Sequence, residues 1–213
     1  MSHSFKENLR RSVGAIVGLC FLFNVPTYAR AEGPPHRFTP AVDSSLPGDC
    51  GLAGEIAATR YFQQRNDRHV VVAAILDTPD ETADSNFSEL TVAEYVLTSH
   101  GCEERWRFED ETAGFQTSIN FLGKSLGVED LDDDGSLDTF FIYQFIADTD
   151  AHPIPSFLVI RVESQFLKAS GTSRLNVGPD DVQGGDFKMS NELRHASQRL
   201  QDKARALWES YVE

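Results

Sequence analysis

Short apolar runs and alternating apolar and polar positions follow one another along most of the chain, a pattern typical of β-strands. The clearest run, His-Val-Val-Val-Ala-Ala-Ile-Leu-Asp at 69–77, lies between polar segments and predicts a buried strand. Further strands are expected at 90–98, 104–108, 116–121, 125–128, 139–146, 157–163 and 166–169. The last two of these are expected to form a hairpin. Residues 53–62 fit a short helix and a strand equally well.

Polar and glycine-containing segments separate the expected strands. We expect a tight turn at His100-Gly101, a polar and acidic loop at 78–88, and a flexible joint at Gly184-Gly185. The chain has no internal repeat, which argues against a propeller built from similar blades.

The C-terminal segment has helical spacing. Ser190 or Asn191 can cap a helix at 191–211. Apolar side chains recur on one face of this helix, at Leu193, Ala196, Leu200, Ala204, Leu207, Trp208 and Tyr211. Such a stripe favours packing against a sheet over a groove for a partner. The sequence therefore predicts an α+β fold, in which the C-terminal helix packs on a mainly antiparallel, twisted sheet.

Residues 1–31 have the features of a signal peptide. Basic residues near the start precede an apolar stretch at 13–25, which is too short for a comfortable membrane span. Ala29-Arg30-Ala31 fits the small-x-small pattern of a cleavage site, so the mature chain is expected to begin at Glu32. An uncleaved anchor is the alternative.

The mature chain, residues 32–213, is expected to be a single periplasmic or extracellular α+β domain with 32–49 as an extended lead. The whole chain has a formal net charge of −14 at pH 7, and loss of the basic signal segment makes the remainder more acidic still. Such a surface repels nucleic acid and anionic lipid headgroups and favours cations and basic partners. Charge that merely keeps an exported protein in solution is the plainer explanation.

Two of the three cysteines, Cys50 and Cys102, lie beyond the expected cleavage site. In an exported protein such a pair most often forms a disulfide. Free thiols and a bridge to another chain are the alternatives. Neither cysteine belongs to a Cys-x-x-Cys pair, so the sequence does not indicate redox catalysis.

The clearest chemistry lies in an acidic segment at 130–138, Asp-Leu-Asp-Asp-Asp-Gly-Ser-Leu-Asp. Calcium takes roughly six to eight oxygen ligands. Alternate positions of a tight loop point inward, so Asp130, Asp132 and Asp134 can converge on one ion. The Ser136 backbone carbonyl and the Asp138 carboxylate, directly or through water, can add further oxygen ligands. The sequence therefore predicts a Ca2+ site.

Three other positions complete the expected loop. Gly135 lies where the chain turns sharply and where a Cβ atom would obstruct the loop. Leu137 is the expected apolar anchor to the core, and Asp133 is expected to be a solvated bystander.

The loop is not a complete EF-hand, because position twelve of that motif is acidic and is Phe141 in this chain. The aromatic and β-branched residues 139–146 also predict a strand after the loop, where an EF-hand has a helix. The segment resembles the Asp-x-Asp-x-Asp-Gly-x-x-Asp loops of FG-GAP, VCBS and dockerin-like proteins. In FG-GAP-type loops the acid at position nine supplies the missing ligand, and Asp138 matches it. An acidic turn without an ion and a site for another cation are the alternatives.

No catalytic set accompanies this loop in the sequence. The six histidines lack metal-ligand spacing, and no nucleophile elbow, phosphate loop or dinucleotide fingerprint is present. Asp148 and Asp150, before His152, form a second acidic turn that could add a ligand to the ion, line a pocket or be an ordinary loop. The sequence therefore does not favour an enzyme.

The order of several features along residues 66–211 suggests a family. These features are Trp106 in a short strand, the acidic loop, the aromatic strand, the Pro-containing loop at Asp150, the strand pair that reaches Gly171-Thr172, Gly184-Gly185-Asp186-Phe187, and the terminal helix with Ala204, Leu207 and Trp208. This order resembles a family of exported bacterial proteins often labelled "surface polysaccharide biosynthesis protein". The resemblance implies export and assigns no activity to particular residues.

Three functions are compatible with the sequence. We favour an exported calcium-binding domain in which the ion stiffens a scaffold that binds something else, such as an envelope protein or a glycan. An envelope enzyme acting on surface polysaccharide, with calcium supporting its site, would need a cleft with two opposed acids about 5–10 Å apart. An interaction or inhibitor protein would use its acidic surface to bind a basic partner.

Overall fold

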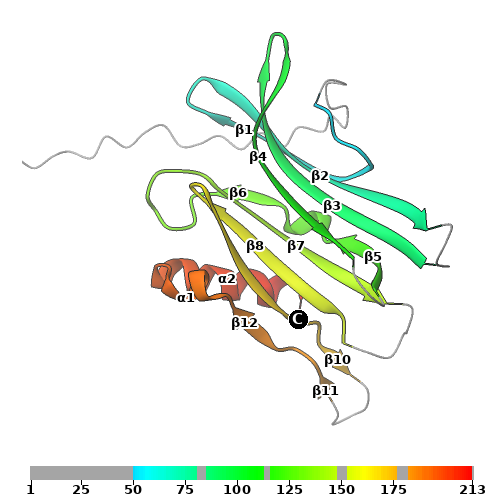
Figure 1. Ribbon diagram of the computed structural model, residues 1–213. Coiled ribbons are helices and arrows are strands. Elements are labelled where there is room, and N and C mark those ends of the chain that lie inside the picture. The colour runs from blue at the N-terminus through cyan, green and yellow to red at the C-terminus, as the bar shows by residue number, and fades with distance from the viewer. Residues whose placement is uncertain (1–49, 81–84, 113–115, 148–152, 177–181, 213) are drawn as a thin grey trace, which may run out of the picture. The chain divides into compact units, whose positions relative to one another are not determined.

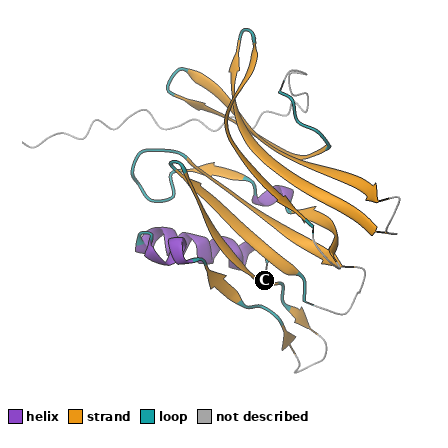
Figure 2. Ribbon diagram, in the orientation of Figure 1, coloured by secondary structure: helices purple, strands orange, loops and turns teal. Residues whose placement is uncertain are grey.

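A computed structural model of the chain describes residues 50–80, 85–112, 116–147, 153–176 and 182–212 (Figure 1). Within these ranges most residues belong to strands, and the two α-helices lie at the C-terminal end (Figure 2). The predicted α+β fold is confirmed. In the described part of the chain, no helix combines the length and apolar character that crossing a membrane requires.

The first sheet is an antiparallel meander of four strands, each paired with the next along the chain. Its strands are β1 (Glu55–Gln64), β2 (Asp67–Asp80), β3 (Ser85–Thr98) and β4 (Gly101–Glu111). The apolar run at 69–77 lies in β2, as predicted. Residues 53–62, for which the sequence left helix and strand open, are mostly β1.

Both predicted bounds of the loop at 78–88 are wrong. Strands β2 and β3 stay paired as far as Asp80 and Ser85. The hairpin extends into polar residues because its ladder is formed by backbone groups, which pair whatever the side chains are.

The second sheet consists of strands that follow the first sheet in the sequence, and all of its pairs are antiparallel. Its order is β12 (Phe187–Met189), β9 (Gln165–Thr172), β8 (Pro155–Val162), β7 (Asp138–Ala147) and β5 (Gln116–Phe121), with β6 (Gly127–Glu129) also paired to β7. The predicted hairpin of β8 and β9 is confirmed. A 3-10 turn (Gly123–Ser125) precedes β6, and two short strands, β10 (Leu175–Asn176) and β11 (Val182–Gln183), pair with each other. The sequence pattern did not indicate the division into two sheets.

Strand β7 has apolar side chains on both faces because both faces of the second sheet are covered. Phe141 and Tyr143 pack in a core shared with the first sheet. Phe140 and Ile142 pack in a core shared with the C-terminal helices. Figure 1 shows the second sheet between these two layers. Burial on both sides accounts for the continuous apolar run at 139–146.

The C-terminal helix is divided in two, where the sequence predicted one continuous helix. The parts are α1 (Asn191–His195) and α2 (Gln198–Tyr211). The chain is extended at Ala196, and the Ser197 hydroxyl then accepts a hydrogen bond from the Leu200 N–H as a new N-cap. The break therefore arises where a serine competes for backbone hydrogen bonds that a continuous helix would use.

The buried face of the two helices follows most of the predicted stripe. The members that are fully or almost fully buried are Leu193, Leu200, Ala204 and Trp208. Tyr211 was predicted to belong to this stripe but is 38% exposed. It is the last residue of α2. Ser190, one of the two predicted caps, is the N-cap of α1.

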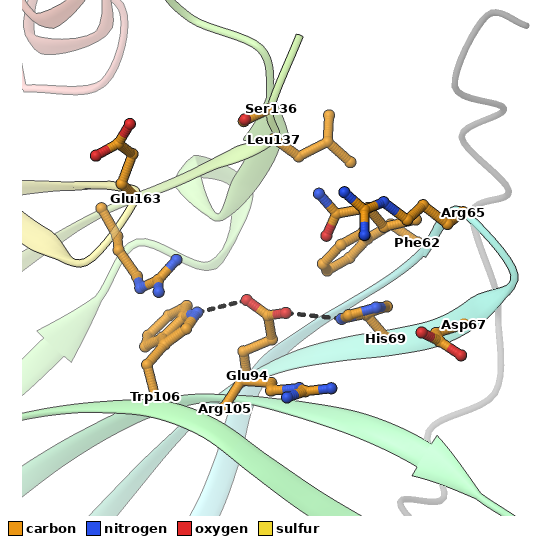
Figure 3. A pocket seen from close by; sticks show the side chains of 12 residues that line it. Phe62, Arg65, Asp67, His69, Glu94, Arg105, Trp106, Ser136, Leu137 and Glu163 are labelled. Carbon is orange, nitrogen blue, oxygen red and sulfur yellow. Dashed lines mark hydrogen bonds and ion pairs between the residues drawn. The ribbon is translucent and has the colours of Figure 1, made fainter. Parts of the chain in front are cut away.

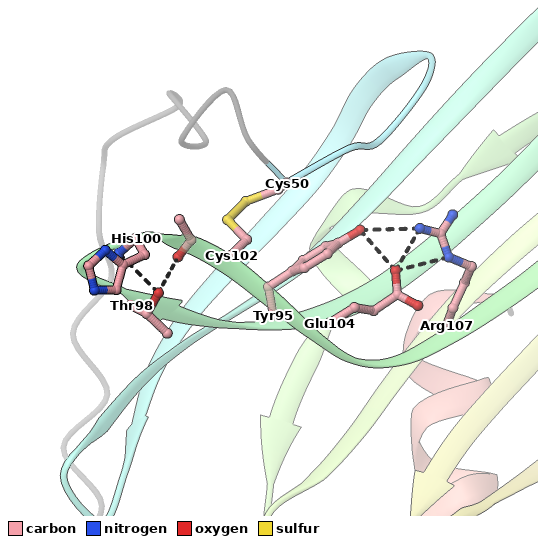
Figure 4. Close-up of a disulfide and its surroundings, with 8 residues drawn as sticks. Cys50, Tyr95, Thr98, His100, Cys102, Glu104 and Arg107 are labelled. Carbon is pink, nitrogen blue, oxygen red and sulfur yellow. Dashed lines mark hydrogen bonds and ion pairs between the residues drawn. A yellow bond between two sulfur atoms is a disulfide. The ribbon is translucent and has the colours of Figure 1, made fainter.

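Cys50 and Cys102 form the disulfide that the sequence predicts, with their Cα atoms 5.1 Å apart (Figure 4). They lie on the face of the first sheet turned away from the second, where Cys50 packs with buried residues that include Val70 and Tyr95. The bond ties the start of the described chain to β4. A disulfide is compatible with the oxidising compartment that the sequence predicts.

Candidate metal site and adjoining cavity

The acidic segment forms the loop between β6 and β7, which pair as far as Glu129 and Asp138. Two leucines hold the loop from opposite sides. Leu131 is 1% exposed and packs in the core beneath the helices. Leu137 packs against the core between the sheets, as the sequence predicts. The loop is therefore anchored to both cores of the domain.

Three of the four predicted carboxylate ligands converge. Oxygen atoms of Asp130, Asp132 and Asp138 all lie within 4.8 Å of one another. Backbone N–H groups of the loop orient two of them. The Asp134 N–H donates to Asp130 at 3.1 Å and to Asp132 at 3.2 Å, and the Gly135 N–H donates to Asp130 at 3.0 Å. The loop backbone thus holds acidic side chains together that would otherwise repel one another.

The remaining two predicted ligands, Asp134 and Ser136, lie at the exposed end of the loop. The Asp134 carboxylate accepts a hydrogen bond from the Ser136 N–H at 2.6 Å, and it does not belong to the convergent group. Ligation by Asp134 and by the Ser136 carbonyl stays a prediction.

Asp138 is the buried member of the group, with 1% of its surface exposed. It accepts a hydrogen bond from the Leu131 N–H at 3.0 Å. The pKa of Asp138 is raised from 3.8 to about 6, chiefly by burial and also by the neighbouring carboxylates, while the bond from Leu131 lowers it. A divalent cation would fit this donor set, because it would supply the counter-charge that the carboxylates lack.

Asp133 was predicted to be a solvated bystander, and its side chain is exposed and lies outside the convergent group, but it has a partner that the sequence did not indicate. Its carboxylate forms an ion pair with Arg199 of α2. The Arg199 Nε also donates to the Leu131 carbonyl at 3.1 Å. The sequence did not indicate this ion pair, because local spacing does not reveal that α2 lies beside the loop. One arginine therefore connects the helix to the loop twice.

Gly135 is needed for its backbone conformation. Its φ of +88° lies in the left-handed region, which favours glycine. A Cβ atom at this position would meet nothing within 4 Å, so the predicted obstruction is wrong.

A cavity of about 410 Å3 adjoins the loop at one end of the core between the sheets (Figure 3). Ser136 and Leu137 contribute to its wall on the side of the loop. Phe62 and Arg65, at the end of β1, lie on the other side. The loop and the first sheet thus share one cavity.

Buried polar side chains of the first sheet form the floor of this cavity. Side chains at alternate positions of β2, β3 and β4 point into the core between the sheets, and His69, Glu94 and Trp106 continue these rows. His69 Nδ1 and a Glu94 oxygen lie 2.7 Å apart, and the Trp106 indole N–H donates to the other Glu94 oxygen. All three residues are buried. Hydrogen bonds to both oxygens compensate the loss of water around Glu94.

Arg161 of β8 faces these residues from the second sheet. It is partly buried, and its guanidinium carbon lies 5.1 Å from the centre of the Trp106 ring. The pKa of Arg161 is lowered, chiefly by burial, while the negative charges of Glu94 and Asp138 act in the opposite direction. The charges of Glu94 in the cavity floor and of Asp138 in the acidic loop therefore both act on Arg161.

The sequence alone did not indicate the cavity. The available indications were Glu94 inside an apolar strand and Arg161 at the end of another, because a charge in an apolar run often has a buried partner. These residues lie close together only because the two sheets face each other. The second predicted acidic turn, at Asp148 and Asp150 before His152, lies outside the described residues.

Comparisons with known proteins find no matching family model, no similar curated protein and no similar solved structure. The resemblances drawn from the sequence stay predictions.

Proposed function

We propose that this chain is an exported calcium-binding domain in which one ion in the 130–138 loop has a structural role. Asp130, Asp132 and Asp138 would hold the ion, with Asp134 and the Ser136 carbonyl as further ligands. The observation that supports this proposal most is the convergence of three carboxylates within 4.8 Å, one of them buried. Like charges held together in this way favour a bound cation.

The donor chemistry favours calcium over other metals. All the proposed ligands are oxygen atoms, whereas zinc and copper prefer nitrogen or sulfur. A flexible loop with several carboxylates and a carbonyl suits the large and adaptable coordination sphere of calcium. Magnesium demands near-octahedral geometry and retains its waters, so we expect it to bind more weakly.

The connections of the loop support a structural role for the ion. Leu131 lies in the core beneath the helices, Leu137 packs against the core between the sheets, and Arg199 links the loop to α2. An ion that binds only the folded loop would stabilise all of these contacts. At ten times its dissociation constant it would add about 1.4 kcal/mol to the free energy of unfolding.

Single substitutions within the loop test this role. In excess calcium, Asp132→Asn and Asp134→Asn should each lower the melting temperature, and in EDTA neither should lower it. Asp133→Asn is the matched control, because it makes the same chemical change at a side chain that pairs with Arg199. It should keep the calcium response. If the Asp132 and Asp134 variants melt like the wild type in calcium, the structural role is wrong.

Export is the second part of the proposal. The features of residues 1–31 and the disulfide between Cys50 and Cys102 support it. Mass spectrometry of the protein recovered from a bacterial culture should show a chain that begins at Glu32. Recovery of the chain from the cytosol with residues 1–31 intact would contradict export.

A further inference from the structure

The cavity beside the loop contains a partly buried arginine, Arg161. The Arg161 guanidinium lies over the Trp106 ring, and within the described ranges no oxygen accepts a hydrogen bond from it. A guanidinium carries several N–H donors in a planar fork, and partial burial makes unpaired donors costly. Because Arg161 lines the cavity, an acceptor on a bound molecule can reach it.

Two of the other charged groups that line the cavity are already engaged. Both oxygens of Glu94 accept hydrogen bonds, one at His69 and one from Trp106. Arg105, which also lines the cavity, lies 3.8 Å from the Glu103 carboxylate. Arg65 also lines the cavity but is exposed, so Arg161 is the partly buried cation of the cavity that is placed to hold an anion.

We propose that this cavity binds a small polar molecule through a carboxylate group that accepts hydrogen bonds from Arg161. The planar fork of a guanidinium matches the two oxygens of a carboxylate. The volume of about 410 Å3 falls within the range of small-molecule sites, roughly 300–1,000 Å3. The acids Asp67, Glu94 and Glu163 also line the cavity, and their charge favours a singly charged carboxylate over a doubly charged phosphate.

The second part of the proposal is that calcium binding in the acidic loop and carboxylate binding in the cavity strengthen each other. This part rests on the proposed calcium function. Ser136 and Leu137 of the loop line the cavity, and the charge of Asp138 acts on Arg161. An ion at Asp138 would reduce the negative charge beside the cavity, so the carboxylate binds more tightly when calcium is present. By reciprocity, the carboxylate then tightens calcium binding by the same factor.

Titration of the whole chain with glucuronate and with lactate, followed by tryptophan fluorescence, tests the site. Trp106 lies beneath Arg161, whereas Trp208 is buried in the other core. Glucose has the ring of glucuronate without the carboxylate and serves as the neutral control, and inorganic phosphate is the competing anion. We expect saturable binding of at least one carboxylate, weaker binding of phosphate and no response to glucose.

Variants of two arginines test whether the carboxylate binds at Arg161. Arg161→Gln should weaken carboxylate binding by roughly tenfold or more. Arg107→Gln is the matched control, because Arg107 pairs with Glu104 on the other face of β4 and does not line the cavity (Figure 4). It should bind as the wild type does. Arg161→Lys keeps the charge without the fork and should give an intermediate affinity if the glutamine variant does not fold.

Several outcomes would overturn the site. These are no saturable response of the wild type to either carboxylate, an equal response to glucose, tighter binding of phosphate, or full affinity in the folded Arg161 variants. The same titrations in EDTA and in calcium separate the two steps. Equal carboxylate affinity in both overturns the coupling, while the calcium proposal stands or falls on the melting behaviour of the loop variants.

Discussion

At the scale of single residues, Asp138 is both a buried residue of a strand and one of three carboxylates that lie close together. Without a cation, both properties destabilise the folded state. Asp138 is the first residue of β7, which buries it, and its carboxylate faces those of Asp130 and Asp132. A buried carboxylate beside like charges destabilises the folded state. Asp138 is therefore better explained as part of a cation site than as a stabilising residue of the apo strand.

Asp138→Asn should remove this cost in the absence of divalent cations. The pKa of Asp138 is raised from 3.8 to about 6, so the folded chain binds this proton more tightly than the unfolded chain does. The resulting stability is fully present below pH 3.8 and is lost as the pH rises through about 6. In EDTA, between about pH 4 and pH 7.5, the wild type should lose up to about 3 kcal/mol relative to the variant. Urea unfolding across this range measures the difference, and parallel curves would contradict the assignment.

Glu94 is also a buried acid, but both of its carboxylate oxygens have hydrogen-bond partners. Glu94→Ala would leave the Trp106 indole N–H and the His69 ring nitrogen without a partner in a buried place. We expect a loss of about 3 kcal/mol in the free energy of unfolding, measured in urea. Glu104→Ala on β4 is the control, since Glu104 is more exposed and pairs with Arg107, and it should cost less than about 1 kcal/mol. Equal losses in the two variants would show that the buried hydrogen bonds contribute little.

Part of this residue-scale picture could be predicted from the sequence. The spacing of Asp130, Asp132 and Asp138 around a glycine is local, so the chain alone indicates that these side chains converge. The ion pair of Asp133 could not be predicted in this way, because its partner Arg199 lies in a distant segment.

At the scale of elements, the break before α2 depends on one serine. Ser197→Ala removes the hydroxyl that accepts from the Leu200 N–H, and we expect a loss of about 1 kcal/mol in the free energy of unfolding. Ser210→Ala is the control near the other end of α2, where the hydroxyl donates to the Ala206 carbonyl on an exposed face. It should change stability by less than about 0.5 kcal/mol. An unchanged urea midpoint for the Ser197 variant would mean that packing alone sets the start of α2.

Element types were more predictable than element boundaries. The β-branched and aromatic runs at 69–77 and 139–146 predict strands, because few alternatives bury such residues. The hairpin of β2 and β3 extends beyond its apolar part, since backbone pairing continues through polar residues. The break between α1 and α2 interrupts a stripe whose spacing is helical on both sides, so periodicity did not reveal it.

At the scale of the folded domain, two sheets and one pair of helices divide the apolar residues between two main cores. The cavity lies where the core between the sheets ends, and it takes Arg161 from one sheet and Glu94 from the other. Composition and spacing do not determine which sheet faces cover each other. The cavity could therefore be identified only from the structure, whereas the acidic loop could be predicted from the sequence.

Calorimetric titration of the purified chain with calcium tests the central claim most directly. We predict one calcium ion bound per chain, with a dissociation constant of about 10⁻⁴–10⁻³ M, as in other extracellular calcium modules. Magnesium should bind more weakly, and Asp130→Asn should weaken calcium binding while Asp133→Asn should not. Absence of a saturable calcium signal, or equal calcium binding by the Asp130 variant and the wild type, would contradict the account.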